Sequence, residues 1–153
     1  PDAWQLELIL RVLRGFDAIV CAGTGYGKSL VFEGLAVLGG KNKVVIVISP
    51  LKALEHDQVR RLRCLWDTAR TTAQLLYLSP EMAQSDGFAK LWKNNQFRRR
   101  LQAVAVDEAH CVEEWGTDDF RPQYRSLYLL RHYTGQEIPF VAFTATCMTS
   151  TFE

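Results

Sequence analysis

The sequence lacks several features that would assign it to a class at once. No apolar run approaches the length of a membrane span, and no targeting peptide is visible, so we expect an intracellular protein with no membrane contact. The net charge is only +1, which is too small for a strong basic field, so any nucleic-acid contact must come from a local face. The four cysteines show no C-x-x-C spacing, which argues against zinc and disulfides and predicts buried free thiols. They are Cys21, Cys64, Cys111 and Cys147.

Apolar runs that alternate with helical patterns are what the sequence does contain. With 153 residues and 48% hydrophobic content, the chain can form one compact domain with a core. Because strands that alternate with helices form parallel sheets, the order predicts an α/β fold with helices on both faces. Ligands of such sheets bind at the carboxyl ends of the strands. We expect strands at 18–21, 44–48, 75–78, 103–106 and 140–143, the first of them buried, and helices at 4–13, 28–38, 52–65, 87–93 and from 122.

A glycine-rich turn, A-G-T-G-Y-G-K-S at 22–29, follows the first expected strand. Its glycines let the backbone adopt conformations that a side chain forbids and let N–H groups approach phosphate oxygens. The helix that opens at Lys28 adds its positive end, Lys28 would reach the β- and γ-phosphates, and the Ser29 hydroxyl would bind Mg²⁺. The first position of the strict phosphate-loop pattern is Ala22 instead of glycine, and the alternative is an ordinary turn before a helix. The residues expected to bind nucleotide here are Gly23, Thr24, Gly25, Gly27, Lys28 and Ser29.

Two adjacent carboxylates follow the fourth expected strand, in the segment V-D-E-A-H at 106–110. We expect Asp107 to hold Mg²⁺ through water and Glu108 to accept a proton from the attacking water, with His110 linking them to neighbouring residues. The alternative is a solvated Asp-Glu pair that caps a helix. Because the glycine turn lies upstream, the two segments together indicate a nucleoside triphosphate site.

Further segments give the chain a family resemblance over nearly its whole length. They are Q at 5, S-P-L-K at 49–52, S-P-E at 79–81, D-E-A-H-C-V-x-x-W-G at 107–116, F-R-P-x-Y at 120–124 and T-A-T at 144–146. This set resembles the first RecA-like lobe of a superfamily 2 helicase, and the stretch after the Asp-Glu pair resembles the RecQ family of DNA helicases. The resemblance implies a P-loop three-layer sandwich with ATP and Mg²⁺ as cofactors.

The resemblance also implies roles for residues outside the two motifs. Gln5 would read adenine, unless it is a plain exposed polar residue. Thr144 and Thr146 would couple hydrolysis to lobe movement, unless they only cap a strand. Segments that would contact DNA hold Pro50, Leu51 and Lys52, and, in an aromatic-rich loop, Trp115, Phe120, Arg121 and Tyr124.

Other interpretations of these segments stay open. Trp115 and Phe120 are core aromatics in the alternative interpretation. The run 98–100 of three arginines could contact phosphate, but we favour a solvated loop.

Three departures from the family pattern affect the expected activity. The stretch 60–74 is short, the loop 115–120 is one residue longer than usual, and the chain stops soon after the fifth strand. We therefore expect a single RecA-like domain over 1–153, incomplete at its carboxyl end, without the second lobe and its arginines. Such a lobe would bind ATP but not unwind DNA by itself.

In the full parent, this lobe would couple ATP hydrolysis to DNA translocation and unwinding, in the nucleus if the source is eukaryotic. The alternatives are a non-catalytic fragment that acts as a binding module, a lobe of an RNA helicase, and an unrelated P-loop ATPase.

Overall fold

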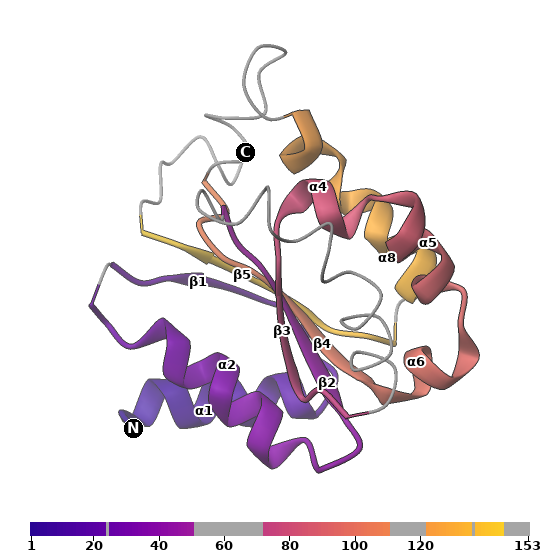
Figure 1. Cartoon of the computed structure of the whole chain (residues 1–153). Coiled ribbons are helices and arrows are strands. Elements are labelled where there is room, and N and C mark those ends of the chain that lie inside the picture. Colours follow the sequence, from indigo (N-terminus) through magenta and orange to yellow (C-terminus); the bar gives the residue numbers. More distant parts are fainter. Residues whose placement is uncertain (24, 51–71, 111–121, 136, 146–153) are drawn as a thin grey trace.

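The computed structural model describes residues 1–23, 25–50, 72–110, 122–135 and 137–145, and these form a five-stranded sheet in the order β1-β5-β4-β2-β3 (Figure 1). Every neighbouring pair of strands is parallel. The predicted parallel α/β architecture is confirmed. The strands are β1 (Ala18–Cys21), β2 (Val44–Ile48), β3 (Leu75–Leu78), β4 (Leu101–Val106) and β5 (Phe140–Thr144).

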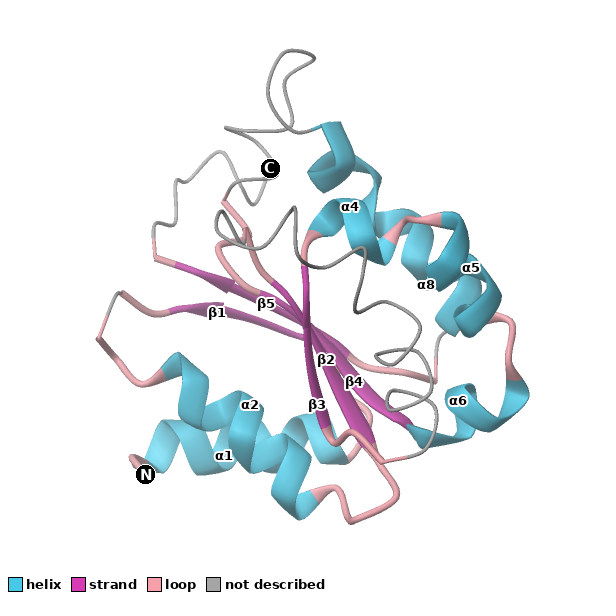
Figure 2. Cartoon of the chain, in the orientation of Figure 1, coloured by secondary structure: helices cyan, strands magenta, loops and turns pink. Residues whose placement is uncertain are grey.

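Helices cover both faces of the sheet, as the alternating order predicts (Figure 2). Side chains of β2 and β4 alternate between two separate cores, one against α1 and α2 and the other against the remaining helices. No helix among these described segments is long and apolar enough to cross a membrane. The helices are α1 (Ala3–Leu13), α2 (Lys28–Leu38), α4 (Pro80–Ala83), α5 (Asp86–Trp92), α6 (Asn95–Arg100), the 3-10 helix η1 (Pro122–Leu129) and α8 (Leu130–Thr134).

The first strand differs from its prediction. β1 lies at an edge of the described sheet and pairs only with β5. Ile19 belongs to neither core of the described residues and is 67% exposed, although we expected a buried strand. The expectation of buried thiols is wrong at Cys21, which is free but exposed on the same strand. The other three cysteines lie outside the described residues. An apolar run therefore indicates a strand here without indicating which of its faces is covered.

Short helices are the second difference. The α4 and α6 helices were not predicted, because four and six residues are too few to show a helical period. Their caps were the available signal, since Ser79 accepts a hydrogen bond from the N–H of Met82 and Asn94 from that of Phe97. The segment from Pro122 is a 3-10 helix before it becomes α8, and the expected helix at 52–65 lies outside the described residues.

A surface ion pair joins the loop before β1 to α8 and β5. Arg131 Nη2 lies 2.6 Å from Asp17 Oδ2, and the Phe140 N–H donates to Asp17 Oδ1 over 2.8 Å. Burial by itself would raise the pKa of Asp17, but the hydrogen bonds from Arg131 and Phe140 and the charge of Arg131 lower it below the ordinary 3.8. Because the pKa is lower in the folded state, ionised Asp17 stabilises the fold, and that contribution is lost as pH falls through the folded-state value.

We therefore expect Asp17→Asn to be less stable than the wild type at pH 7, and the difference in unfolding free energy should narrow as pH falls below about 4. The effect is modest, because the Asp17 side chain is 57% exposed and solvent screens the pair. Urea midpoints measured at a series of pH values check this. A difference between the urea midpoints of the two proteins that stays constant down to acid pH would contradict the assignment of the ion pair.

Candidate functional site

Three neighbouring strands deliver the predicted site residues to one end of the sheet. β1 runs into the glycine turn, β4 into Asp107, and β5, which lies between them, ends at Thr144. Backbone hydrogen bonds fix this edge, because the Ala22 N–H donates to the Thr144 carbonyl over 2.9 Å and the Ala109 N–H to the Phe143 carbonyl over 2.7 Å. The carboxyl end of a parallel sheet is where ligands bind in such folds.

The glycine turn has the backbone that its sequence predicts. Gly25 and Gly27 have φ values of +88° and +76°, a region that residues with a side chain rarely adopt. Helix α2 begins at Lys28 directly after Gly27, as expected, so its first N–H groups face the end of the turn. A free helix amino end behind a glycine turn is a ready anion-binding site.

Gln5 closes this turn from the side. It lies on α1, is only 3% exposed, and its Nε2 donates to the carbonyls of Tyr26 and Gly27 over 3.2 Å each. Its Oε1 accepts from the N–H of Asp2 over 2.7 Å. The alternative interpretation of Gln5 as an exposed polar residue is therefore wrong, while its role as an adenine reader stays a prediction.

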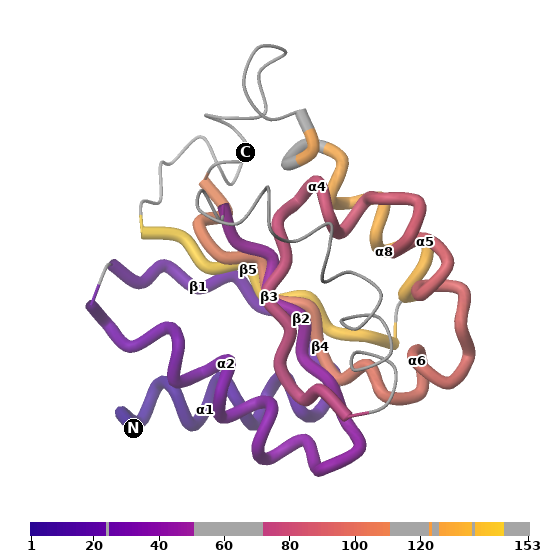
Figure 3. Tube along the Cα trace, viewed as in Figure 1, coloured from indigo at the N-terminus to yellow at the C-terminus, as the bar shows by residue number. Residues whose placement is uncertain are grey.

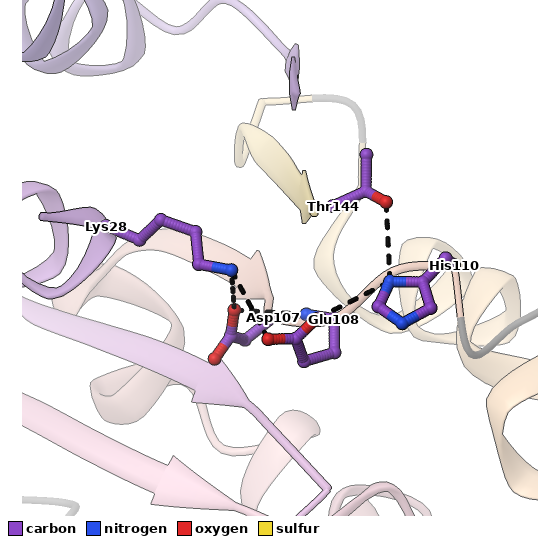
Figure 4. Close-up of polar contacts among 5 residues, drawn as sticks. All are labelled: Lys28, Asp107, Glu108, His110 and Thr144. Atoms are coloured by element: carbon purple, nitrogen blue, oxygen red, sulfur yellow. Dashed lines mark hydrogen bonds and ion pairs between the residues drawn. The ribbon is translucent and has the colours of Figure 1, made fainter. Parts of the chain in front are cut away.

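Lys28 meets both predicted carboxylates (Figure 4). Its Nζ lies 3.3 Å from Glu108 Oε1 and 3.7 Å from Asp107 Oδ1, and the lysine side chain is only 12% exposed. One positive and two negative charges leave this cluster with a net charge of −1. The cluster therefore favours a further cation beside the lysine.

Glu108 has a backbone conformation that the sequence did not reveal. Its φ is +51°, which makes it the one non-glycine residue with positive φ among the described segments. The neighbours on each side are anchored, because the Asp107 N–H donates to the Ile48 carbonyl over 2.8 Å and Ala109 bonds to β5. The Glu108 N–H itself donates to Asp107 Oδ1 over 3.0 Å. Strain of this kind persists where the surroundings hold it, and it is concentrated at functional sites.

His110 extends the cluster to the end of β5. Its Nδ1 lies 3.5 Å from Glu108 Oε2 and 3.4 Å from the Thr144 Oγ1 (Figure 4). The chain of contacts therefore runs from Lys28 through Glu108 and His110 to Thr144, and it joins the three motifs that the sequence placed on three different strands.

The structure describes some of the other predicted site residues, and the rest lie outside its described ranges. Ser29 is exposed in the first turn of α2, Gly23 is half-buried in the turn, and Pro50 is half-buried just after β2. Tyr124 belongs to η1, and only its backbone is among the described parts of the chain. Thr24, Leu51, Lys52, Trp115, Phe120, Arg121 and Thr146 lie outside the described residues.

The favoured interpretation of 98–100 as a solvated loop is wrong about the loop and about Arg100, although Arg98 and Arg99 are exposed. These residues lie in α6, and Arg100 is only 8% exposed. Its Nε donates to the Asn42 carbonyl and its Nη2 to the Ala73 carbonyl. The sequence gives no sign that one of three adjacent arginines is buried, because that depends on carbonyls more than 25 residues away.

The family profile described as "DEAD/DEAH box helicase" matches residues 2–153. The chain belongs to the DEAD/DEAH box helicase family. Within it, the sequence is 38% identical to "ATP-dependent DNA helicase RecQ" of Synechocystis over 165 residues. It is 39% identical to "ATP-dependent DNA helicase hus2/rqh1" of Schizosaccharomyces pombe and 37% identical to "ATP-dependent helicase SGS1" of Saccharomyces cerevisiae. The resemblance to RecQ helicases is confirmed.

Each of these matches covers 93% of this chain but 34%, 12% and 11% of the respective relative. This helicase domain therefore spans about a third or less of the relatives it matches. Among solved structures, the DUF1998 helicase MrfA bound to DNA and AMPPNP has a TM-score of 0.65 over 96% of this chain and 24% of its own. At 18% identity that likeness shows the fold alone.

Proposed function

We propose that this chain is the ATP-binding lobe of a RecQ-like DNA helicase, which couples ATP hydrolysis to translocation and unwinding of DNA in the complete protein. The observation that carries the proposal is the line of contacts from Lys28 through Glu108 and His110 to Thr144. It links the phosphate-binding turn, the paired carboxylates and the end of β5, which is what coupling of hydrolysis to movement requires.

Lys28 is the residue that the nucleotide engages first. The β- and γ-phosphates compete with Asp107 and Glu108 for its ammonium group, because a phosphate carries more negative charge than a carboxylate. Once Lys28 turns to phosphate, Glu108 is free to accept a proton from the attacking water. His110, within contact distance of Glu108 and Thr144, then transmits the change of charge to the end of β5.

Asp107 offers an oxygen ligand suited to Mg²⁺ beside the Lys28 ammonium, and Ser29 follows Lys28 in the first turn of α2. The Ser29 hydroxyl and the Asp107 carboxylate would hold the ion, and the net charge of −1 on the cluster favours it. When bound, Mg²⁺ would neutralise charge on the phosphates.

Gln5 would connect the adenine base to the turn. Both of its amide hydrogens are occupied by the carbonyls of Tyr26 and Gly27, while Oε1 accepts one bond and has a second lone pair. Adenine would therefore be read by Oε1, and its binding would tighten the contact between α1 and the glycine turn.

DNA and a second RecA-like lobe are the partners of this proposal. DNA would lie against residues that follow the carboxyl ends of the strands, which include Pro50 after β2 and Tyr124 of η1. The second lobe would close over the nucleotide and supply arginines to it. In a eukaryotic source the whole protein would act in the nucleus.

The test is thermal stabilisation of the chain by Mg·ATP, measured beside Lys28→Ala. At about 100 times its Kd, a nucleotide stabilises a fold by about 2.7 kcal/mol. We expect Lys28→Ala to abolish this shift, because Lys28 is the one lysine or arginine among the described residues that contacts Asp107 or Glu108. Gln5→Ala should reduce the shift without removing it.

Lys90→Ala, which replaces an exposed lysine on α5, is the matched control and should retain the full shift. A folded wild type with no shift at millimolar ATP would favour the non-catalytic binding module instead. A longer chain containing both lobes, if stimulated by RNA more than by DNA, would favour an RNA helicase.

A further inference from the structure

A cluster of basic residues lies at the end of the sheet opposite the candidate site. The turn between α2 and β2 holds Lys41 and Lys43, and α6 holds Arg98 and Arg99 immediately before β4. β2 and β4 are neighbours, with Val44 paired to Leu101, so these two segments enter the sheet side by side (Figure 3). Residues separated by more than 50 positions thus share one surface, which we call the basic patch (Lys41, Lys43, Arg98 and Arg99).

Hydrogen bonds hold the two segments of the patch together. Lys43 Nζ donates to the Arg99 carbonyl over 3.0 Å, and Arg100 Nε donates to the Asn42 carbonyl over 3.1 Å. Arg100 also reaches the Ala73 carbonyl over 2.6 Å, before β3. Arg100 therefore acts as an internal clamp between three strand entries, and the patch rests on a fixed backbone.

Packing directs the other two arginines outward. Phe97 and Arg100 are three positions apart on one face of α6 and are 0% and 8% exposed, so Arg98 and Arg99 between them face solvent. Phe97 is anchored by Phe88 and Trp92, whose ring centroids lie 6.3 Å and 5.8 Å from its own. Exposed charges on so rigid a support are pre-organised for a ligand.

The sequence around the two segments of the patch lacks acidic residues. The stretches 39–54 and 87–106 contain no aspartate or glutamate. Arg98 and Arg99 line a hollow of about 360 Å³, in which Glu137 is the one carboxylate among the described lining residues. The carboxyl end of α6 favours one nearby cation by about 0.3–1 kcal/mol, but that does not account for four in one patch.

We propose that the basic patch is a second nucleic-acid contact, which binds the phosphate backbone without reading sequence. Guanidinium groups pair with phosphate oxygens in a bidentate geometry, and lysines add point charges beside them. The patch lies at the amino ends of β2 and β4, whereas the candidate nucleotide site lies at the carboxyl ends. It would therefore hold nucleic acid apart from any strand at the nucleotide edge, and it does not depend on the proposed ATP site.

The experiment is fluorescence anisotropy of the 153-residue chain with a labelled 20-nucleotide single strand and a 20-base-pair duplex. We expect Arg98→Gln/Arg99→Gln to weaken binding about tenfold at 0.1 M salt and to reduce the slope of log K against log salt by about 1.4 for single strands or 1.8 for duplex. Glu137→Gln should strengthen binding, because it removes the opposing charge from the same hollow. The probe that binds more tightly shows whether the patch prefers single-stranded or duplex nucleic acid.

Two matched variants test whether the lost affinity belongs to the patch. Arg98→Lys/Arg99→Lys keeps the charge and should retain most of the affinity, and Arg11→Gln/Arg14→Gln removes the same charge from α1, which covers the other face of the sheet. The proposal would be overturned if the Arg11→Gln/Arg14→Gln protein lost as much DNA affinity as the Arg98→Gln/Arg99→Gln protein, or if the latter lost none. So would tighter binding of a polyglutamate peptide than of either DNA, which would indicate an acidic protein partner. Mg·ATP should stabilise the Arg98→Gln/Arg99→Gln protein as much as it stabilises the wild type, so failure of the ATP site is distinguishable from failure of the patch.

Discussion

Replacing Trp92 by alanine is expected to lower the free energy of unfolding by about 3–5 kcal/mol, which is a large part of the stability of a domain of this size. Trp92 is 1% exposed and is among the largest fully buried side chains of the described core. Its ring centroid lies 5.0 Å from that of Phe88 and 5.8 Å from that of Phe97. Its indole N–H also donates to the Ala83 carbonyl over 3.1 Å. The substitution therefore leaves a cavity between α5, α6 and β-strand residues and an unpaired carbonyl.

Urea unfolding followed by circular dichroism measures the effect, with Phe16→Ala as the control. Phe16 is 63% exposed, so removing its ring should change stability by less than about 0.5 kcal/mol. Trp92→Phe keeps most of the volume and removes the hydrogen bond, and we expect a loss of about 1–2 kcal/mol. A Trp92→Ala protein as stable as the wild type would mean that α5 and α6 are not packed on the sheet as described.

Gly27→Ala is the second substitution with a large expected effect, about 2–4 kcal/mol of unfolding free energy. A Cβ at this position would lie 2.6 Å from Gln5 Nε2, and the backbone already has φ +76°, where a side chain is strained. Gln5 would have to move and give up its bonds to the carbonyls of Tyr26 and Gly27. The thermal shift with Mg·ATP should fall as well, because the turn loses its shape.

Gly15→Ala is the matched control, because Gly15 has φ +92° and nothing within 4 Å of an added Cβ. Gly15→Ala introduces the backbone strain without a steric clash and should lower the free energy of unfolding by about 1–2 kcal/mol. In a Gln5→Ala background, Gly27→Ala should cost less than in the wild type, since the clashing amide has gone. Additive effects of the two substitutions would show that Gln5 and the turn are not in contact.

Local sequence patterns predicted most of the helices and strands. The run of five apolar residues at Val44–Ile48 predicted the bounds of β2, and the four-residue run at Leu75–Leu78 predicted those of β3. Glycines before Lys28 indicated both the turn and the start of α2, because their backbone freedom is a property of the residue itself. The short α4 and α6 helices were not predicted, because a helical period of apolar residues cannot be recognised in so few positions.

Burial was harder to predict than secondary structure. β1 is entirely apolar, as β2 is, yet Ile19 is exposed while every residue of β2 is buried. The difference comes from what covers each face of the strand. β2 contributes side chains to both cores, whereas Ile19 belongs to neither core of the described residues. Arg100 shows the converse, a charged residue buried because carbonyls from two other turns meet there.

By itself, the sequence determined the parallel α/β class, the glycine turn before α2 and the paired carboxylates after β4, because each is encoded in a few adjacent residues. Only the tertiary structure decided that Lys28 meets Glu108 from 80 positions away, that Glu108 takes a left-handed conformation, and that Gln5 closes the glycine turn. The physical reason is that these contacts depend on which strands are neighbours and on their register. Strand order is a property of the whole packed sheet, and no short segment records it.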